Sequence, residues 1–288
     1  GGAAGAGRAA PNGATTAKDQ ASAPRGAAAT RARPREDAPA DPGVGIHAAS
    51  EGETVGNLDH RKVIAIDGPA AAGKSTVARE LADALDILLF DTGSLYRAVT
   101  YAALRRNTDL ADEGELAHIA SSCGIELRPA SVEDGRLADV YLDGQDVTWE
   151  IRSPDVDANV SRVAAYPAVR SALLNVQRKI ADGNKVVMVG RDIGTVVTPE
   201  AGTKIYLDAT VEERARRRYH DIRMLGEDLD YASVLDDLRE RDYKDSTRAT
   251  APLKAADDAI RIKTDGLSVD EIVLQIERIV RERWNGMP

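Results

Sequence analysis

The stretch VIAIDGPAAAGKSTVARELADAL, residues 63–85, decides the fold of this chain. It opens with an apolar run, residues 63–66, that is typical of a buried strand, and it continues into an amphipathic helical pattern. Between the two, residues 68–75 match the pattern G-x-x-x-x-G-K-S/T in the strand-to-helix setting that a phosphate-binding P-loop requires. The alternative, a glycine-rich turn that merely begins a helix, is disfavoured because both glycines, the lysine and the serine are in place.

The residue types of this loop fit the binding of a phosphate chain. Its glycines let the backbone approach phosphate, while consecutive backbone N–H groups and the helix N-terminus supply positive potential. Lys74 adds a mobile cation, and the Ser75 hydroxyl is placed to ligate Mg²⁺. The predicted nucleotide contacts are Gly68, Pro69, Ala70, Ala71, Ala72, Gly73, Lys74, Ser75 and Thr76.

Length, charge and composition narrow the possible classes of protein. The 288 residues can bury a large core, and a net charge of −9 gives no global attraction to nucleic acid. The single cysteine, Cys123, excludes an internal disulfide framework. No apolar run approaches the ~18 residues of a membrane span, and the N-terminus lacks the apolar segment of a secretion signal. We therefore expect a cytoplasmic protein that binds neither membrane nor nucleic acid. We also expect it to be a monomer.

The chain divides into a tail and a folded domain. Residues 1–58 are rich in Ala, Gly and Pro, contain no aromatic side chain, and have no Val, Leu, Ile or Met before Val44. Such a segment cannot bury enough apolar surface to offset its chain entropy, so we interpret it as disordered. Residues 59–288 contain the strand and helix patterns of a folded domain. At about 108–183 the pattern changes from strand-helix alternation to short alternating runs, which indicates an insertion.

Strand and helix patterns alternate through the folded domain. Apolar runs predict strands at residues 62–67, 87–90, 185–189, 203–208 and 259–263. Their alternation with helical patterns predicts an α/β fold, in which a parallel sheet has helices on both faces. Within the insertion, the Asp143-Gly144 pair between alternating apolar residues predicts a hairpin and hence a small antiparallel sheet.

Charged residues gather where predicted strands end. Arg97 follows the second strand within DTGSLYR, and Arg191 and Asp192 follow the strand at residues 185–189. Because ligands bind at the carboxyl edge of an open parallel sheet, we expect these side chains to meet a common ligand.

A predicted helix that begins at the capping-box pattern Thr210-x-x-Glu213 carries a dense run of arginines. They are Arg214, Arg216, Arg217, Arg218 and Arg223. Arginines this close repel one another unless anions lie among them, which favours a phosphate clamp over a solvated face. The segment at about 213–230 is therefore predicted to be an arginine-rich lid. The total positive charge exceeds what one triphosphate needs, which suggests a second phosphorylated substrate and phosphoryl transfer between the two.

Five blocks of sequence resemble bacterial cytidylate kinases, a family of P-loop nucleoside monophosphate kinases. The blocks are GPAAAGKST at 68–76, DTGSLYR at 91–97, NVSRVAAYPAVR at 159–170, GRDIGTVV at 190–197 and RERDYKDSTRATAPL at 239–253. The resemblance extends from residue 62 to about residue 284. It implies a P-loop core, an insertion that binds the nucleoside monophosphate, and an arginine lid. The implied reaction is Mg²⁺-dependent transfer of the γ-phosphoryl group of ATP to CMP or dCMP.

The same resemblance implies a role for individual residues. The implied catalytic residues are Lys74, Arg191, Arg217 and Arg248. The implied acceptor-binding residues are Arg97, Ser161, Arg170, Arg191, Asp192, Arg241, Asp245 and Arg248. Among them, Ser161, Arg170 and Asp192 would read the cytosine edge, because a carboxylate and a hydroxyl can accept from its amino group and a guanidinium can donate to O2 and N3.

Two alternatives stay open at this point. One is a P-loop kinase for another small acceptor, which uridylate phosphorylation would favour. The other is a GTP-binding switch or regulatory nucleotide-binding module. No N-K-x-D sequence for guanine follows the P-loop, which counts against that second alternative.

Overall fold

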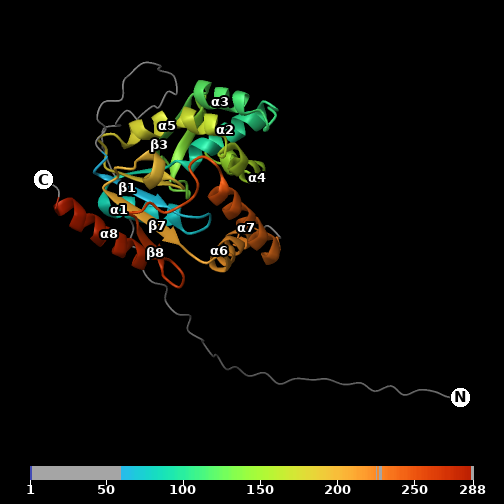
Figure 1. The fold of residues 1–288 in the computed structure, drawn as a ribbon. Coiled ribbons are helices and arrows are strands. Elements are labelled where there is room, and N and C mark those ends of the chain that lie inside the picture. Colours follow the sequence, from blue (N-terminus) through green and yellow to red (C-terminus); the bar gives the residue numbers. More distant parts are fainter. Residues whose placement is uncertain (2–59, 225, 227–228, 287–288) are drawn as a thin grey trace, which may run out of the picture. The chain divides into compact units, whose positions relative to one another are not determined.

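The computed structural model describes residues 1, 60–224, 226 and 229–286. Its main sheet is parallel and has the strand order β2-β6-β1-β7-β8. Strands β1, β7 and β8 of this sheet are labelled in Figure 1. The strands are β1 (Val63–Asp67), β2 (Leu88–Asp91), β6 (Val186–Gly190), β7 (Thr203–Asp208) and β8 (Ile260–Lys263). The predicted parallel sheet is confirmed, and each predicted strand boundary lies within one residue of the observed one.

Helices cover both faces of this sheet, as predicted. Val63 and Ala65 of β1 belong to the hydrophobic core on one face, whereas Ile64 and Ile66 belong to the core on the other. The helices of the first core are α2 (Gly93–Arg105), α3 (Glu113–Ser122), α4 (Pro154–Val163) and α5 (Pro167–Ala181), and those of the second are α1 (Lys74–Leu85) and α8 (Val269–Asn285). Because alternate residues of a strand point to opposite faces, a continuously apolar strand suits burial between two helical layers.

A small antiparallel sheet lies within the predicted insertion. It has the order β3-β4-β5, and its strands are β3 (Ile125–Pro129), β4 (Ala138–Leu142) and β5 (Gln145–Asp146). Asp143 and Gly144 have φ angles of 51° and 80°, and a two-residue hairpin turn of type I′ requires this left-handed conformation at both positions. The predicted hairpin is therefore confirmed. Two shorter segments are η1 (Glu150–Arg152) and the π-helix η2 (Ile193–Val197).

Two further helices, α6 (Val211–Met224) and α7 (Tyr231–Thr247), pack on each other beside the P-loop through a third apolar cluster. The last turn of α7 reaches Thr247. In that turn the Thr247 hydroxyl donates to the Tyr243 carbonyl at 2.6 Å, a bond that keeps the side chain within the helix.

The predicted capping box at the start of α6 forms only in part. Thr210 Oγ1 accepts from the Glu213 backbone N–H at 3.3 Å. The Thr210 N–H donates instead to Asp265 at 3.1 Å, and the Glu213 carboxylate binds Arg216 and Arg217. In a full box the Glu213 carboxylate would accept from the Thr210 N–H. That bond is absent because the N–H donates to Asp265, a residue distant in sequence.

Gly68, at the end of β1, allows the P-loop to lie directly against β7. Its φ is 152°, and a Cβ at this position would lie 2.2 Å from the backbone carbonyl oxygen of Leu207. We expect Gly68→Ala to lower the free energy of unfolding by about 3 kcal/mol, because a buried backbone atom cannot move aside. Thermal and urea unfolding measure this. Gly114→Ala in helix α3 is the matched control, and an equal effect of both would contradict the argument.

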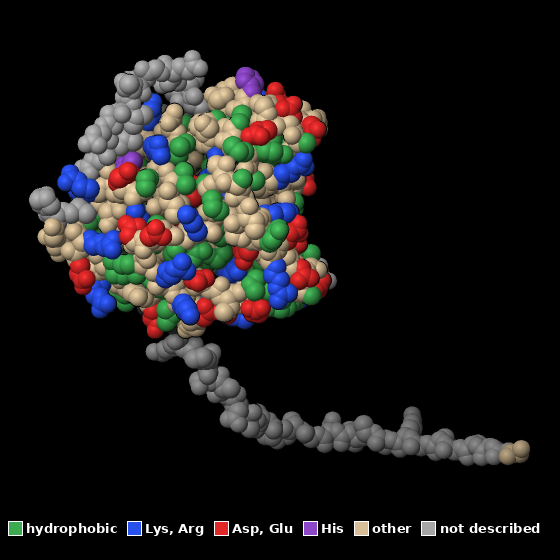
Figure 2. Space-filling view, in the orientation of Figure 1, with side chains coloured by type: hydrophobic (Ala, Val, Ile, Leu, Met, Phe, Trp, Pro, Cys, Tyr) green, Lys and Arg blue, Asp and Glu red, His purple; other side chains and the backbone are tan. Residues whose placement is uncertain are grey.

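Several expectations concern residues outside this description. The predicted disordered tail, residues 1–58, lies outside the described residues apart from Gly1, and so do positions 225, 227 and 228 of the predicted lid. In the described part of the chain, no helix combines the length and apolar character needed to cross a bilayer. On the face shown in Figure 2, basic and acidic side chains are interspersed.

Candidate functional site

A cleft of about 890 Å³ lies at the carboxyl edge of the parallel sheet. It is lined by the P-loop, by the ends of β2 and β6, and by helices α4, α5, α6 and α7. The predicted site residues in its lining are Ala70, Ala71, Ala72, Gly73, Lys74, Ser75, Thr76, Arg97, Ser161, Arg170, Arg191, Asp192, Arg217, Arg241, Asp245 and Arg248. Two predicted contacts, Gly68 and Pro69, are not among the described residues of this lining. Residues separated by nearly 180 positions in the chain are thus brought to one cavity.

Lys74 is the buried cation of the P-loop half of the cleft. Its side chain is only 6% exposed, and its Nζ donates to the Pro69 carbonyl at 2.5 Å. Burial and the neighbouring Arg191 lower the pKa of Lys74, while Asp91 and Asp67 oppose that shift. An anionic ligand beside the buried ammonium would favour its charged form.

Arg217 of α6 lies next to the P-loop. A Cβ built on Gly73 would be 3.8 Å from Arg217 Nη1, and Gly73 itself has a left-handed φ of 84°. The guanidinium donates to the Thr264 carbonyl at 2.6 Å and to Glu213 at 2.9 Å. Arg217 is thus held where it can reach a phosphate bound to the loop.

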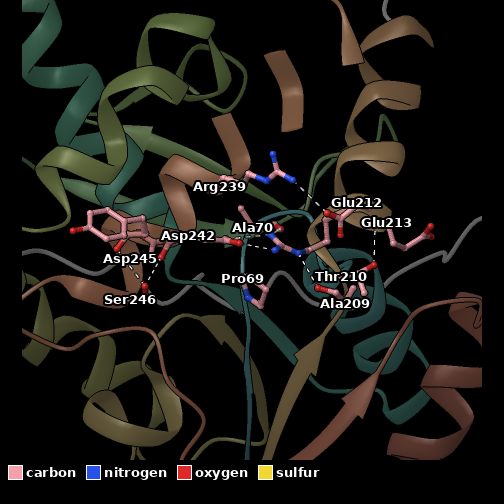
Figure 3. A network of polar contacts seen from close by, with 12 residues as sticks. Pro69, Ala70, Ala209, Thr210, Glu212, Glu213, Arg239, Asp242, Asp245 and Ser246 are labelled. Atoms are coloured by element: carbon pink, nitrogen blue, oxygen red, sulfur yellow. Dashed lines mark hydrogen bonds and ion pairs between the residues drawn. The ribbon is translucent and has the colours of Figure 1, made fainter. Parts of the chain in front are cut away.

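Arg214 corrects the expectation that the arginines of α6 all serve a phosphate clamp. It is 4% exposed, and it donates to the carbonyls of Ala209 and Ala70 at 3.1 Å each. It also forms an ion pair with Asp242 of α7 at 2.5 Å. Figure 3 shows its partners Ala70, Ala209 and Asp242, which come from the P-loop, the segment before α6 and helix α7. Arg214 therefore ties the P-loop to α6 and α7, and its charge is already neutralised.

We expect Arg214→Met to lower the free energy of unfolding by about 3 kcal/mol, because it leaves Asp242 and the Ala70 carbonyl without their partner. Arg216→Met on the same helix is the matched control. Arg216 is 67% exposed and pairs with Glu213, so its loss should cost about 0.5 kcal/mol or less. Urea unfolding of both variants measures the difference in the free energy of unfolding. If Arg214→Met lost no more than the control, Arg214 would not tie these elements together.

The part of the cleft beyond the P-loop contains a buried ion pair between Arg170 of α5 and Asp192, which follows β6. Both side chains are 7% exposed or less. Arg248 Nη2 lies 3.5 Å from the other carboxylate oxygen of Asp192 and has no hydrogen-bond partner, although it is buried. The Arg170 guanidinium stacks over the ring of Tyr96 with 5.2 Å between Cζ and the ring centroid. A buried guanidinium nitrogen that lacks a hydrogen-bond partner is a donor that a ligand in this pocket could satisfy.

Further arginines surround the middle of the cleft. Arg191 Nε donates to Asp245 at 2.9 Å. Arg241 Nε is buried without a partner, and burial together with Arg191 lowers the Arg241 pKa. Arg97 pairs with Asp157, a residue of α4. Ser161, also on α4, is half-buried in the lining.

Sequence reasoning missed three acidic residues: Asp91 and Asp157 in the lining of this cleft, and Asp67 buried at the end of β1. Asp67 ends β1, accepts from the backbone N–H groups of Ile193 and Gly194 at 2.8 Å each, and has its pKa raised to about 6 by burial. Asp91 ends β2 and lines the cleft, and Asp157 lies one turn before Ser161. For Asp67 and Asp91 the signal was available, since each is the last residue of a predicted strand or follows it directly. Asp157 had no such signal.

A parallel sheet whose first strand leads into this loop, with a basic cleft at its carboxyl edge, defines a P-loop protein. A family model described as cytidylate kinase matches residues 64–282. The chain is 50% identical over 209 residues to a cytidylate kinase of Herpetosiphon aurantiacus, an alignment that covers 73% of this chain and 90% of that protein. It is 49% identical over 229 residues to a cytidylate kinase of Anoxybacillus flavithermus, covering 80% and 100%. The chain belongs to the cytidylate kinase family.

Proposed function

We propose that this protein transfers the γ-phosphoryl group of ATP to CMP, and also to dCMP, with ADP and the cytidine diphosphate as products. The observation that carries the proposal is the joining of two different halves in one cleft. The P-loop half has the buried cation Lys74, and the other half ends in the buried pair Arg170–Asp192. Membership of the cytidylate kinase family supports the same assignment.

In the donor half, the P-loop amides and Lys74 hold the phosphates of ATP, and Arg217 approaches from α6. Phosphoryl transfer needs in-line positioning, neutralisation of charge and exclusion of water more than it needs covalent help. We propose that the segment from about residue 213 to 230 serves as the lid that excludes water. The position of Arg217 beside Gly73 supports this role.

In the acceptor half, Arg97, Arg191 and Arg248 neutralise the CMP phosphate whose oxygen attacks the γ-phosphorus. Arg241 and Asp245 contact the sugar. Cytosine presents an amino donor next to the acceptors N3 and O2, which Asp192 and Ser161 on one side and Arg170 on the other can match. Uracil reverses the donor and acceptor at the first two positions, so the same groups would reject it. The residues at about 108–183 form the acceptor-binding insertion in this proposal.

The oxygen donors of the cleft fit Mg²⁺. The Ser75 hydroxyl at the start of α1 and the Asp91 carboxylate both line it, and Mg²⁺ favours hard oxygen ligands. Within the described ranges there is no cluster of three or more His, Cys, Asp or Glu that could cage a metal, so the ion would be held largely by phosphate oxygens and water. Bound there, it would neutralise charge on the β- and γ-phosphates.

One coupled assay tests the proposed function. The full chain is given ATP and Mg²⁺ with CMP, dCMP, UMP, AMP or GMP, and ADP formation is recorded. We expect turnover with CMP and dCMP and a kcat/KM for UMP that is about 100-fold lower. Turnover with AMP or GMP alone would overturn the proposal, and GTP binding without transfer to any monophosphate would favour a regulatory module.

The lining residues that the proposal uses all come from a single chain. We therefore propose that a monomer is competent, and equilibrium sedimentation alongside the assay tests this. A specific activity that falls on dilution, together with sedimentation of an oligomer, would contradict it.

A further inference from the structure

Asp157 is an acidic side chain that lies among the arginines of the acceptor half. Arg97 Nη2 donates to its Oδ1 at 2.5 Å, and Arg218 Nη2 donates to its Oδ2 at 2.8 Å. Arg241 Nη1 lies 3.6 Å from Oδ1. The three arginines belong to α2, α6 and α7, so one carboxylate on α4 meets guanidinium groups from three other helices.

The surroundings of this carboxylate keep it ionised. Its side chain is 25% exposed, and desolvation by itself would raise its pKa. Arg97, Arg241 and Arg218 outweigh desolvation and lower the Asp157 pKa below its ordinary value. A negative charge is therefore present in the acceptor half before any substrate arrives.

We propose that Asp157 is an internal counter-anion for the arginines of the acceptor half, so that the acceptor binds by exchanging its phosphate for this carboxylate at Arg97. The inference rests on the proposed function, in which these arginines meet the CMP. The built-in anion limits the mutual repulsion of the arginines before the acceptor binds. It also weakens the binding of every phosphate at that position, including the phosphorylated product that must leave.

Arg97 does not depend on Asp157 alone for its orientation. Its Nη1 also donates to the backbone carbonyl of Ile151 at 3.2 Å. Removal of the carboxylate charge should therefore leave Arg97 in the cleft. Arg152 and Arg191 line the same space, whereas the acids there besides Asp157 include Asp91, Asp192 and Asp245. Of these, Asp192 and Asp245 already pair with other arginines.

The test compares Asp157→Asn with the wild-type protein. Calorimetry with inorganic phosphate, and separately with CMP, measures binding to the full chain, and steady-state kinetics give KM and kcat for CMP. We expect both dissociation constants and the KM to fall by about threefold or more, because a competing charge is gone. Slower product release should leave kcat unchanged or reduced. A structural role alone would raise these constants, and a phosphate dissociation constant that is unchanged or higher would overturn the proposal.

Two further variants separate the counter-anion from other effects. Asp155→Asn removes the same charge from the same helix at an exposed position, and we expect it not to tighten phosphate binding. Arg218→Gln breaks the contact between α4 and α6 but leaves the carboxylate. If Arg218→Gln tightened phosphate binding as much as Asp157→Asn, a loosened α6 would explain the effect and the proposal would be wrong. If Asp157→Asn did not fold, Asp157→Ser would take its place with the same expected outcome.

Failure of this inference and failure of the proposed function are distinguishable. Wild-type turnover with CMP together with an unchanged phosphate affinity of Asp157→Asn would reject the counter-anion alone. Tighter phosphate binding by the variant without any wild-type turnover of CMP would support the counter-anion and reject the proposed substrate.

Discussion

A Lys74→Ala variant is expected to lose about a thousandfold in kcat, at saturating ATP and CMP. The Lys74 ammonium is the buried cation of the P-loop, and phosphoryl transfer depends on groups already placed to neutralise the migrating charge. Solvent water cannot replace it, because the side chain is only 6% exposed. The measurement is initial ADP formation in the coupled assay, with both substrates raised until the rate no longer changes.

The variant should remain folded. Burial lowers the pKa of Lys74 because it disfavours the charged form. Removing the side chain therefore takes away this desolvation cost along with the bond to Pro69. Lys62→Ala, which removes an exposed lysine just before β1, is the matched control and should keep wild-type kcat. Near-normal turnover of Lys74→Ala with an unchanged melting temperature would contradict the proposed role of the P-loop in catalysis.

An Arg170→Ala variant is expected to raise the KM for CMP by about 100-fold while the KM for ATP changes by less than about threefold. Loss of a buried charge-assisted contact to the substrate costs about 1.5–3 kcal/mol, and each 1.4 kcal/mol is tenfold in affinity. Arg170 lies in the acceptor half, away from the P-loop, so the donor should bind as before. Equal increases in both KM values would contradict a role on the cytosine side.

Stability complicates this variant, because Arg170 is paired with Asp192 in a buried site. Breaking the pair leaves an uncompensated carboxylate, and we expect a loss of about 3 kcal/mol in the free energy of unfolding. The double variant Arg170→Ala/Asp192→Asn removes that carboxylate, so it should recover stability without recovering the KM for CMP. Arg178→Ala, on the same helix, is a structural control. Arg178 donates to the carbonyls of Val196 and Val197, so its loss should lower stability without selectively raising the CMP KM.

Local patterns predicted the core of the fold. Helix α1 begins at Lys74 and ends at Leu85, as its periodicity and the P-loop pattern require. The Ser268 capping box forms in full, whereas the one at Thr210 forms in part because Asp265 supplies a better-placed acceptor. Patterns confined to a few residues therefore succeed until a residue distant in sequence competes for the same hydrogen bond.

Those site residues that directly follow a strand could be predicted from the sequence. Arg97, Arg191 and Asp192 follow predicted strands, and the parallel sheet brings their ends to one edge. Their partners were not predictable, because an ion pair depends on which helices pack together. Arg191 pairs with a residue 54 positions away, and Arg97 with one 60 positions away.

The sequence by itself determined the P-loop, the parallel sheet and the family, since each rests on residue types at fixed local spacing. Only the tertiary structure decided how the arginines divide their work. Arg214 is a buried structural tie and Arg217 faces the loop, although the two are one helical turn apart in the same arginine run. Asp157 meets three of the arginines only after α2, α4, α6 and α7 have packed around the cleft. Charge on a helix is visible in the sequence, but the groups that neutralise it come from the packing of other helices.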